Sequence, residues 1–119
     1  MTELQTLKKE VNQKFKQKFN QEPTFVSAAP GRINIIGEHT DYNFGLSMPA
    51  AINRWVIISF AFRDDNQVKL ASESFGTEMI YEPGKPFTPE ESWQKYIYGA
   101  LEIFQRTDKI TKGFNAFIW

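Results

Sequence analysis

Residues 29–49 read APGRINIIGEHTDYNFGLSMP, and the rest of the chain is organised around this stretch. Its opening, Ala29-Pro30-Gly31, predicts a turn, because proline fixes φ and glycine frees it. Residues 32–36 are a short, mostly apolar run, which predicts one buried strand. Residues 37–43 form a polar segment rich in carboxylate, hydroxyl and amide groups. Because binding sites favour loops held on a rigid scaffold, this segment predicts a binding site for a polar ligand.

The composition is that of one small folded domain or part of one. The chain has 119 residues, with 14 Lys and Arg against 14 Asp and Glu, so nothing favours nucleic acid or an anionic membrane as a partner. Its 11 Phe, 3 Trp and 4 Tyr supply a packed core. The absence of cysteine excludes disulfides and thiol catalysis. No segment approaches the ~20 apolar residues of a membrane helix or has the apolar centre of a signal peptide, which predicts a cytoplasmic protein.

The flanking sequence predicts an α+β fold with a mainly antiparallel sheet and packed helices. Apolar residues at spacings of three and four predict a helix from about Thr2 to Asn20. Residues 50–62 are apolar on both strand faces, which predicts a strand covered on both sides. Residues 64–66 predict a hairpin turn, residues 67–75 a half-exposed strand, and residues 78–82 a third antiparallel strand.

The last third of the chain predicts one more helix and one more strand. Residues 83–89 contain three prolines and a glycine, which predicts a loop, and residues 105–112 predict a polar connector. Residues 114–119 are apolar on both faces, as in the interior of a sheet, yet no sequence follows them to cover either face. We therefore expect exposed apolar surface and self-association. The helix, over residues 92–104, has an apolar stripe of Trp93, Ile97, Ala100, Leu101 and Phe104.

Three interpretations of the polar segment are open. The chain has no Walker A or GxGxxG motif, and a single histidine cannot give a His-x-x-x-His metal motif. Glu38, His39 and Asp41 could form part of a metal site if the loop folded them together. They could instead be turn groups bonded to backbone amides. They could also hold sugar hydroxyls, because a hydroxyl donates one hydrogen bond and accepts two, and so pairs with carboxylate acceptors and with imidazole or amide groups.

Arg32 and Trp93 have two interpretations each. Arg32 forms a structural ion pair, or it directs its guanidinium at a phosphate or a developing alkoxide. Trp93 belongs to the core, as buried tryptophans usually do, or it is a platform for a ligand.

The stretch resembles the galactokinase signature of the GHMP small-molecule kinase superfamily. That signature reads Gly-Arg-x-Asn-x-Ile-Gly-Glu-His-x-Asp-Tyr-x-x-Gly-x-x-x-Pro, and residues 31–49 match every defined position. Mevalonate-type relatives usually carry lysine at the position of Arg32 and lack the His-Thr-Asp-Tyr run. The N-terminal helix, the hairpins after residue 49 and the Ser92-Trp93-x-x-Tyr96 run are similar too, so the resemblance covers nearly the whole chain.

The resemblance implies ATP-dependent phosphorylation of galactose at its anomeric hydroxyl, with Mg²⁺. It implies that Arg32 is the catalytic residue beside that hydroxyl, that Trp93 lies on the adenine side of the ATP site, and that no residue here binds metal. The family fold has two α/β domains with the active site between them. Residues 1–119 match the first part of the N-terminal domain, without the phosphate-binding loop, the catalytic aspartate or the C-terminal domain. The galactose-binding residues that it implies are Glu38, His39 and Asp41.

We therefore expect a monomeric parent galactokinase that was cut at the edge of the next motif. By itself the chain should not phosphorylate galactose, because phosphoryl transfer depends on positioning and charge around the γ-phosphate. The alternatives are a kinase for a related sugar such as N-acetylgalactosamine or arabinose, a galactokinase-like sensor that binds sugar and ATP without catalysis, and a free-standing binding domain. The sequence after residue 119 would separate them, since a damaged phosphate loop favours the sensor.

Overall fold

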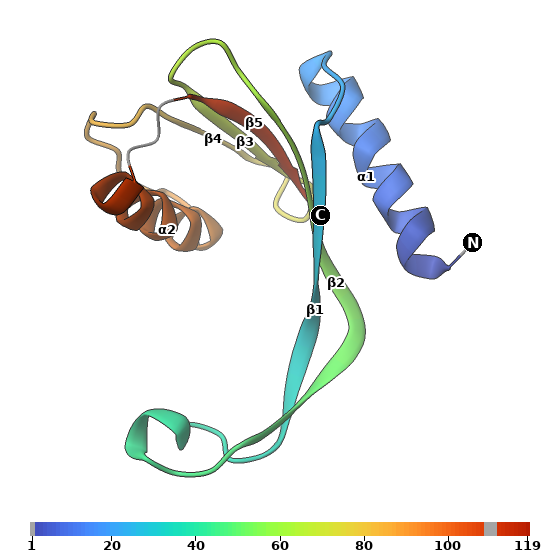
Figure 1. The fold of residues 1–119 in the computed structure, drawn as a ribbon, viewed down its shortest axis with the longest axis vertical. Coiled ribbons are helices and arrows are strands. Elements are labelled where there is room, and N and C mark those ends of the chain that lie inside the picture. Colours follow the sequence, from blue (N-terminus) through green and yellow to red (C-terminus); the bar gives the residue numbers. More distant parts are fainter. Residues whose placement is uncertain (1, 109–111) are drawn as a thin grey trace.

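The computed structural model describes residues 2–108 and 112–119 of the chain. One five-stranded sheet lies between two helices, with α1 on one face and α2 on the other (Figure 1). This is the α+β arrangement that the sequence predicts. The elements in chain order are α1 (Glu3–Phe19), β1 (Phe25–Ile36), the short 3-10 helix η1 (Asp41–Asn43), β2 (Met48–Phe62), β3 (Val68–Ser72), β4 (Glu78–Tyr81), α2 (Ser92–Asp108) and β5 (Phe114–Ile118).

Helix α1 begins and ends where its sequence predicts. The backbone N–H of Gln5 donates to Thr2 Oγ1 at 3.3 Å, and the N–H of Thr2 donates to Gln5 Oε1 at 2.9 Å. This reciprocal capping box satisfies backbone donors that the first turn leaves free. Asn20 ends the helix in the left-handed conformation, with φ 49°. The helix packs on the sheet through Val11 and Phe15, which are fully buried.

The sheet order is β1-β2-β5-β3-β4, so the last strand lies between the second and the third. Strand β5 runs antiparallel to β2 and parallel to β3. The predicted hairpin at residues 64–66 is therefore wrong, because the connection from β2 to β3 spans the width of β5. The predicted half-exposure of β3 is also wrong: Val68, Leu70 and Ala71 are all buried. The antiparallel pairing of β4 with β3 is confirmed.

Two apolar clusters fill the two faces of the sheet, and β5 contributes to both of them. The strand predicted over residues 114–119 is therefore confirmed as a sheet interior, but the expectation that neither face is covered is wrong. Residues 50–62 are covered on both sides only from Ile57 to Ala61, since Val56 is 50% and Phe62 51% exposed. The cluster beneath α1 consists of Val11, Phe15, Ile57, Ala61, Ala71 and Phe117. The cluster beneath α2 consists of Val68, Leu70, Met79, Tyr81, Trp93, Leu101 and Ala116.

Helix α2 is longer than predicted and packs through a shifted face. It continues to Asp108, so residues 105–108 are helical rather than part of a connector, and residues 109–111 lie outside the described residues. Ala100 and Phe104 were predicted in its buried stripe but are exposed, Phe104 by 61%. Tyr98 lies in the packed face instead, in edge-to-face contact with Tyr81. Burial raises the pKa of Tyr81 to about 12, and its hydroxyl donates to the Glu102 carboxylate at 2.8 Å.

A buried amide ties the first residues of β5 to the segments that directly follow α1 and β2. Asn115, 4% exposed, donates through Nδ2 to Gln21 Oε1 at 2.9 Å and accepts from Arg63 Nη1 at 2.9 Å. The Arg63 fork also holds both carboxylate oxygens of Asp65, at 2.8 and 2.5 Å. Asp65 Oδ1 in turn accepts from the backbone N–H of Gln67 at 3.0 Å. The hydrogen bonds from Arg63 lower the pKa of Asp65 to about 2.

Strands β1 and β2 extend beyond the two helices as a two-stranded arm (Figure 1). The radius of gyration is 16.4 Å, compared with about 13.5 Å for a compact chain of this length. We define the arm as residues 31–36 and 48–52. The strand predicted over residues 32–36 is present, but its burial is not, because Ile33, Ile35 and Ile36 are 50%, 63% and 68% exposed.

The predicted turn at Ala29-Pro30-Gly31 is wrong, because β1 continues through it. The register with β2 shifts there, from Pro30 opposite Trp55 to Gly31 opposite Ile52. Proline has no N–H to donate, so it is tolerated at such a bulge and does not need to end the strand. The two extra residues on β2 are Asn53 and Arg54. The side chain of Asn53 links this bulge to α1. Its Nδ2 donates to Glu3 Oε2 at 2.9 Å, and its Oδ1 accepts from Trp55 Nε1 at 2.9 Å.

In the part of the chain that the structure describes, neither helix has the length and apolar character needed to cross a membrane.

We expect the free energy that Asp65 contributes to folding to depend on pH. Its pKa in the folded chain, about 2, lies below the ordinary value of 3.8, so the carboxylate stabilises the fold above pH 3.8 and loses this effect as the pH falls toward 2. Urea unfolding of the chain and of Asp65→Asn should therefore differ most near neutral pH and converge in acid. A constant difference across this range would show that the charge of Asp65 is not responsible.

Substitution of two glycines by alanine should change stability in opposite directions. A Cβ at Gly113 would lie 2.1 Å from the backbone oxygen of Gln67, so Gly113→Ala should force the start of β5 away from the β2–β3 connection. We expect a cost of about 1–3 kcal/mol, typical of overpacking. Gly99 lies within α2 with no atom within 4 Å of a built Cβ, so Gly99→Ala should stabilise the chain by about 0.5–1 kcal/mol. Urea denaturation measures both, and equal effects would contradict the close approach at Gly113.

Candidate functional site

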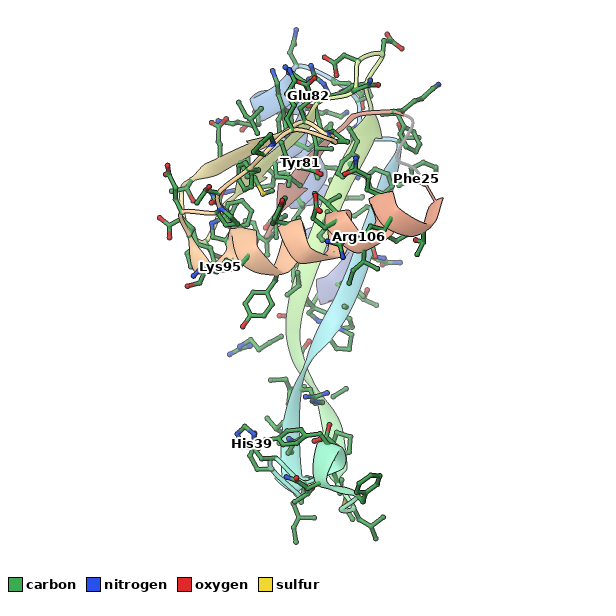
Figure 2. All side chains as sticks on the ribbon, turned by 90° about the vertical axis from the view of Figure 1, so that its left-hand side faces the viewer. Phe25, His39, Tyr81, Glu82, Lys95 and Arg106 are labelled. Atoms are coloured by element: carbon green, nitrogen blue, oxygen red, sulfur yellow. The ribbon has the colours of Figure 1, made fainter. Side chains whose placement is uncertain are left out.

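The candidate site is the loop of residues 37–47, which joins β1 to β2 at the far end of the arm. Figure 2 shows His39 at this end, well away from the α2 residues Lys95 and Arg106. The side chains of Glu38, His39 and Asp41 are exposed, and so are Phe44 and most other residues of the loop. The structure thus brings three predicted site residues together on one loop at the tip of a projecting arm.

The two ends of the loop cross at Gly37. Its φ is +90°, and a Cβ there would lie 2.4 Å from the backbone oxygen of Leu46. Only glycine accepts both this conformation and this approach. This close approach of Gly37 to Leu46 keeps the first and last residues of the loop next to each other.

Thr40 closes the loop from inside. Its hydroxyl lies 2.8 Å from the carbonyl oxygen of Gly37 and 3.0 Å from that of Leu46, and it shares its single hydrogen between these two ends of the loop. Its own carbonyl oxygen accepts from the N–H of Asn43 at 3.0 Å and of Gly45 at 2.8 Å, which closes the η1 turn. Thr40 therefore satisfies the backbone groups that a loop of this shape leaves unpaired.

The three predicted ligand-binding residues take no part in this closure. Glu38 accepts from Asn34 Nδ2 at 3.2 Å, and His39 Nδ1 lies 2.5 Å from the hydroxyl of Tyr42. Within residues 2–108 and 112–119, the carboxylate of Asp41 has no hydrogen bond or ion pair. The interpretation as turn groups bonded to backbone amides is therefore wrong for these three side chains. The side chain that bonds the loop backbone is that of Thr40, and its partners are carbonyl oxygens.

Arg32 lies on β1, opposite Ala51 of β2, with its side chain exposed. No carboxylate of the described residues pairs with it, so the structure does not support the interpretation as a structural ion pair. Its guanidinium is the cationic group of the signature stretch, on the strand that leads into the loop. Its role at a phosphate stays a prediction.

Trp93 lies in the core beneath α2 and is only 9% exposed. Its indole Nε1–H donates to Thr77 Oγ1 at 3.1 Å, and its ring stacks on Phe75 at a centroid distance of 6.3 Å and an interplanar angle of 15°. The structure therefore confirms Trp93 as a core residue and does not bring it to the loop. Its place beside adenine stays a prediction.

The described residues include no group of three or more His, Cys, Asp or Glu side chains arranged to hold a metal ion. The interpretation of Glu38, His39 and Asp41 as part of a metal site therefore has no support in this geometry. What the loop offers is a set of exposed carboxylate and imidazole groups on a backbone that other residues hold in place.

Sequence reasoning missed two residues that touch the predicted ligand-binding groups. Asn34 bonds Glu38, and Tyr42 bonds His39. Both are defined positions of the signature, and Tyr42 follows His39 by three residues, the separation of side chains that share one turn. That spacing is the signal that could have identified Tyr42.

Comparison with known proteins places this loop in a family. Residues 13–62 match the family model described as the galactokinase galactose-binding signature. The chain is 41% identical over 101 residues to a galactokinase from Actinobacillus succinogenes and 42% identical over 93 residues to one from Pasteurella multocida. These matches cover 82% and 76% of this chain, but only 26% and 24% of the relatives. The chain thus spans about a quarter of the length of the curated relatives that it matches.

Two solved structures share the fold. The galactokinase of Lactococcus lactis, solved in complex with galactose, superposes with a TM-score of 0.76 and 34% identity, over 98% of this chain and 30% of that one. The mevalonate kinase of Methanococcus jannaschii superposes with a TM-score of 0.64 over 80% of this chain and 32% of that one. At 16% identity, the second likeness concerns the fold alone.

The shared fold is that of the GHMP small-molecule kinases, with an α+β architecture. Within that superfamily, the matched signature and the two curated relatives are those of galactokinases. Residues 13–62 carry the galactokinase galactose-binding signature, and the chain is similar to galactokinases over most of its own length.

The closure of the loop by Thr40 gives a prediction with a matched control. Thr40→Val removes the hydroxyl but keeps the branched shape, so it should raise the hydrogen-exchange rates of loop amides such as that of Gly45. We expect a local loss of about 0.5–1.5 kcal/mol, the usual net value of a hydrogen bond, with little change in global unfolding. Thr40→Ser keeps the hydroxyl, so its loop amides should exchange at the same rates as those of the unsubstituted 119-residue chain. Equal protection in Thr40→Val and Thr40→Ser would show that the hydroxyl does not hold the loop.

Proposed function

We propose that this chain provides the galactose-binding part of a galactokinase, an enzyme that transfers the γ-phosphoryl group of ATP to the anomeric hydroxyl of galactose. The observation that carries the proposal is the loop of residues 37–47. The stretch that contains this loop, residues 31–49, matches every defined position of the signature, and the loop exposes Glu38, His39 and Asp41 while Thr40 closes the backbone. The bound galactose of the Lactococcus lactis relative supports galactose as the sugar.

The chemistry of the loop suits a polyhydroxylated ligand. Glu38 and Asp41 offer carboxylate oxygens that accept hydrogen bonds from sugar hydroxyls, and the Asp41 carboxylate has no other partner among the described residues. Neighbouring hydroxyls on a sugar ring present both donors and acceptors, so a loop with carboxylates and one imidazole can match several of them at once. The fixed backbone lowers the entropy lost when the ligand binds.

Arg32 is the proposed catalytic residue. During the transfer the anomeric oxygen forms a bond to the γ-phosphorus while the bond from that phosphorus to the β–γ bridging oxygen of ATP breaks, and ADP leaves. The proton of the anomeric hydroxyl would pass to a base, for which the resemblance implies the catalytic aspartate outside residues 1–119. Negative charge is spread over the transferring group, and a fixed guanidinium beside it stabilises that charge. Arg32 fits this role because it is exposed on the arm and free of ion pairs within the described residues.

The proposal includes ATP and Mg²⁺, although the described residues do not fit a resident metal ion. Mg²⁺ is usually bound mainly by substrate phosphates in kinases, and we assign it no ligand in this chain. The adenine side is proposed near Trp93, whose buried ring would shape that region from beneath. Residues 1–119 are proposed as part of the N-terminal domain of a monomeric, cytoplasmic enzyme, as the resemblance implies.

A sugar titration of the 119-residue chain tests the proposal. We expect galactose to shift the backbone amide resonances of residues 37–43 in NMR spectra, and glucose, its C4 epimer, to shift them less. Asp41→Ala should weaken galactose binding by about 1–3 kcal/mol, because it leaves polar partners unpaired. The control is Asp64→Ala, an exposed aspartate on the β2–β3 connection at the other end of the sheet.

Two outcomes would count against this proposal. If galactose leaves the loop resonances of the parent chain unchanged, the chain does not bind the sugar. If galactose binds but Asp41→Ala and Asp64→Ala have the same affinity, Asp41 is not a sugar ligand.

A further inference from the structure

His39 and Tyr42 form a side-chain pair within the loop. His39 Nδ1 lies 2.5 Å from the Tyr42 hydroxyl oxygen, and the two rings meet edge to face, with centroids 5.8 Å apart and planes at 70°. The contact leaves the other ring nitrogen of His39, Nε2, without a partner among the described residues. One nitrogen of the only histidine in the chain is therefore occupied, and the other faces no protein group.

The backbone holds both rings in place. His39 has φ +56°, a left-handed conformation that histidine adopts more readily than most residues. Asn43 Nδ2 donates to the carbonyl oxygen of His39 at 3.1 Å, and Thr40 closes the η1 turn that carries Tyr42. Since the residues on both sides of the pair are fixed, the contact between the rings is set by the loop itself.

The direction of the hydrogen bond follows from the two groups. A phenol O–H is a better donor than the N–H of a neutral imidazole, and a bare imidazole nitrogen is a better acceptor than a phenol oxygen. Tyr42 therefore donates to His39 Nδ1. In a neutral imidazole the nitrogen opposite the acceptor carries the proton, so the proton of His39 is on Nε2.

We propose that Tyr42 is a positioning residue, which fixes His39 as the Nε2–H tautomer and makes Nε2–H a donor to a hydroxyl oxygen of the bound sugar. The proposal rests on galactose binding by this loop. Ionised Glu38 and Asp41 only accept hydrogen bonds, so a sugar oxygen that needs a donor must find one elsewhere. With the opposite tautomer, Nε2 would present a lone pair to that oxygen and repel it.

The ring nitrogens of the single histidine test the tautomer directly. In the ¹⁵N-labelled 119-residue chain at pH of about 8.5, where an ordinary imidazole is neutral, Nδ1 should have the chemical shift of an unprotonated nitrogen and Nε2 that of a protonated one. Tyr42→Phe keeps the ring contact but removes the hydroxyl, and it should bring the two shifts closer together as the other tautomer becomes populated. Tyr96→Phe, at a tyrosine that is 82% exposed on α2, is the matched control and should leave both shifts unchanged.

Galactose affinity tests the consequence for binding. Tyr42→Phe should weaken galactose binding by roughly three- to tenfold, the loss expected for one hydrogen bond, while Tyr96→Phe should leave it unchanged. If the ring-nitrogen shifts of Tyr42→Phe equal those of the parent chain, Tyr42 does not set the tautomer and the proposal fails. It also fails if the shifts change but the affinity does not. If the parent chain binds no galactose, the proposed function fails, and the nitrogen shifts alone then show whether Tyr42 fixes the tautomer.

Discussion

Strand β5 joins two antiparallel pairs, β1–β2 and β3–β4, into one sheet, and the positions of both helices depend on this insertion. Because the strand is apolar on both faces, it supplies Ala116 to the cluster beneath α2 and Phe117 to the cluster beneath α1. Its polar residue, Asn115, is buried as well, and its amide is satisfied by Gln21, just after α1, and by Arg63, just after β2. A buried amide costs free energy unless its hydrogen bonds are made, so this network fixes the register of β5 as well as its place. Gly113 completes the junction, since its N–H donates to the carbonyl oxygen of Asp65 at 2.6 Å.

Local features of the fold could be predicted from the sequence, and pairings between distant segments could not. The ends of α1 follow from Thr2 and Asn20, because capping depends on residues within one turn. The connection at residues 64–66 has the composition of a hairpin turn, but composition does not show that another strand, nearly fifty residues later, lies between the two strands that it joins. The same insertion buries β3, whose alternation of Lys69 with apolar neighbours is typical of a half-exposed strand. The bulge at Pro30 was missed because proline and glycine favour a turn and a bulge alike.

The candidate site shows the same division. The motif identified Glu38, His39 and Asp41, and the structure places all three on one exposed loop. The motif could not show which polar residues stabilise the loop and which remain available for a ligand, because that depends on the position of each hydroxyl and amide group. Thr40 takes the backbone role, and this leaves the three other side chains available for a ligand. The position of Trp93 depends on the packing of α2 against the sheet, which the helical period predicts only approximately, as the exposure of Phe104 shows.

The place of β5 in the sheet also determines when the fold can be completed during synthesis. The β1–β2 and β3–β4 pairs each join neighbouring segments and can form as soon as those segments leave the ribosome. The edges of β2 and β3 that β5 fills must wait until α2 and then residues 114–118 have emerged. During that interval, the nascent chain carries two strand edges with free backbone donors and acceptors beside apolar faces, which is the kind of surface that pairs with other chains. The time that translation takes over α2 and residues 114–118 therefore sets how long these two edges stay unpaired.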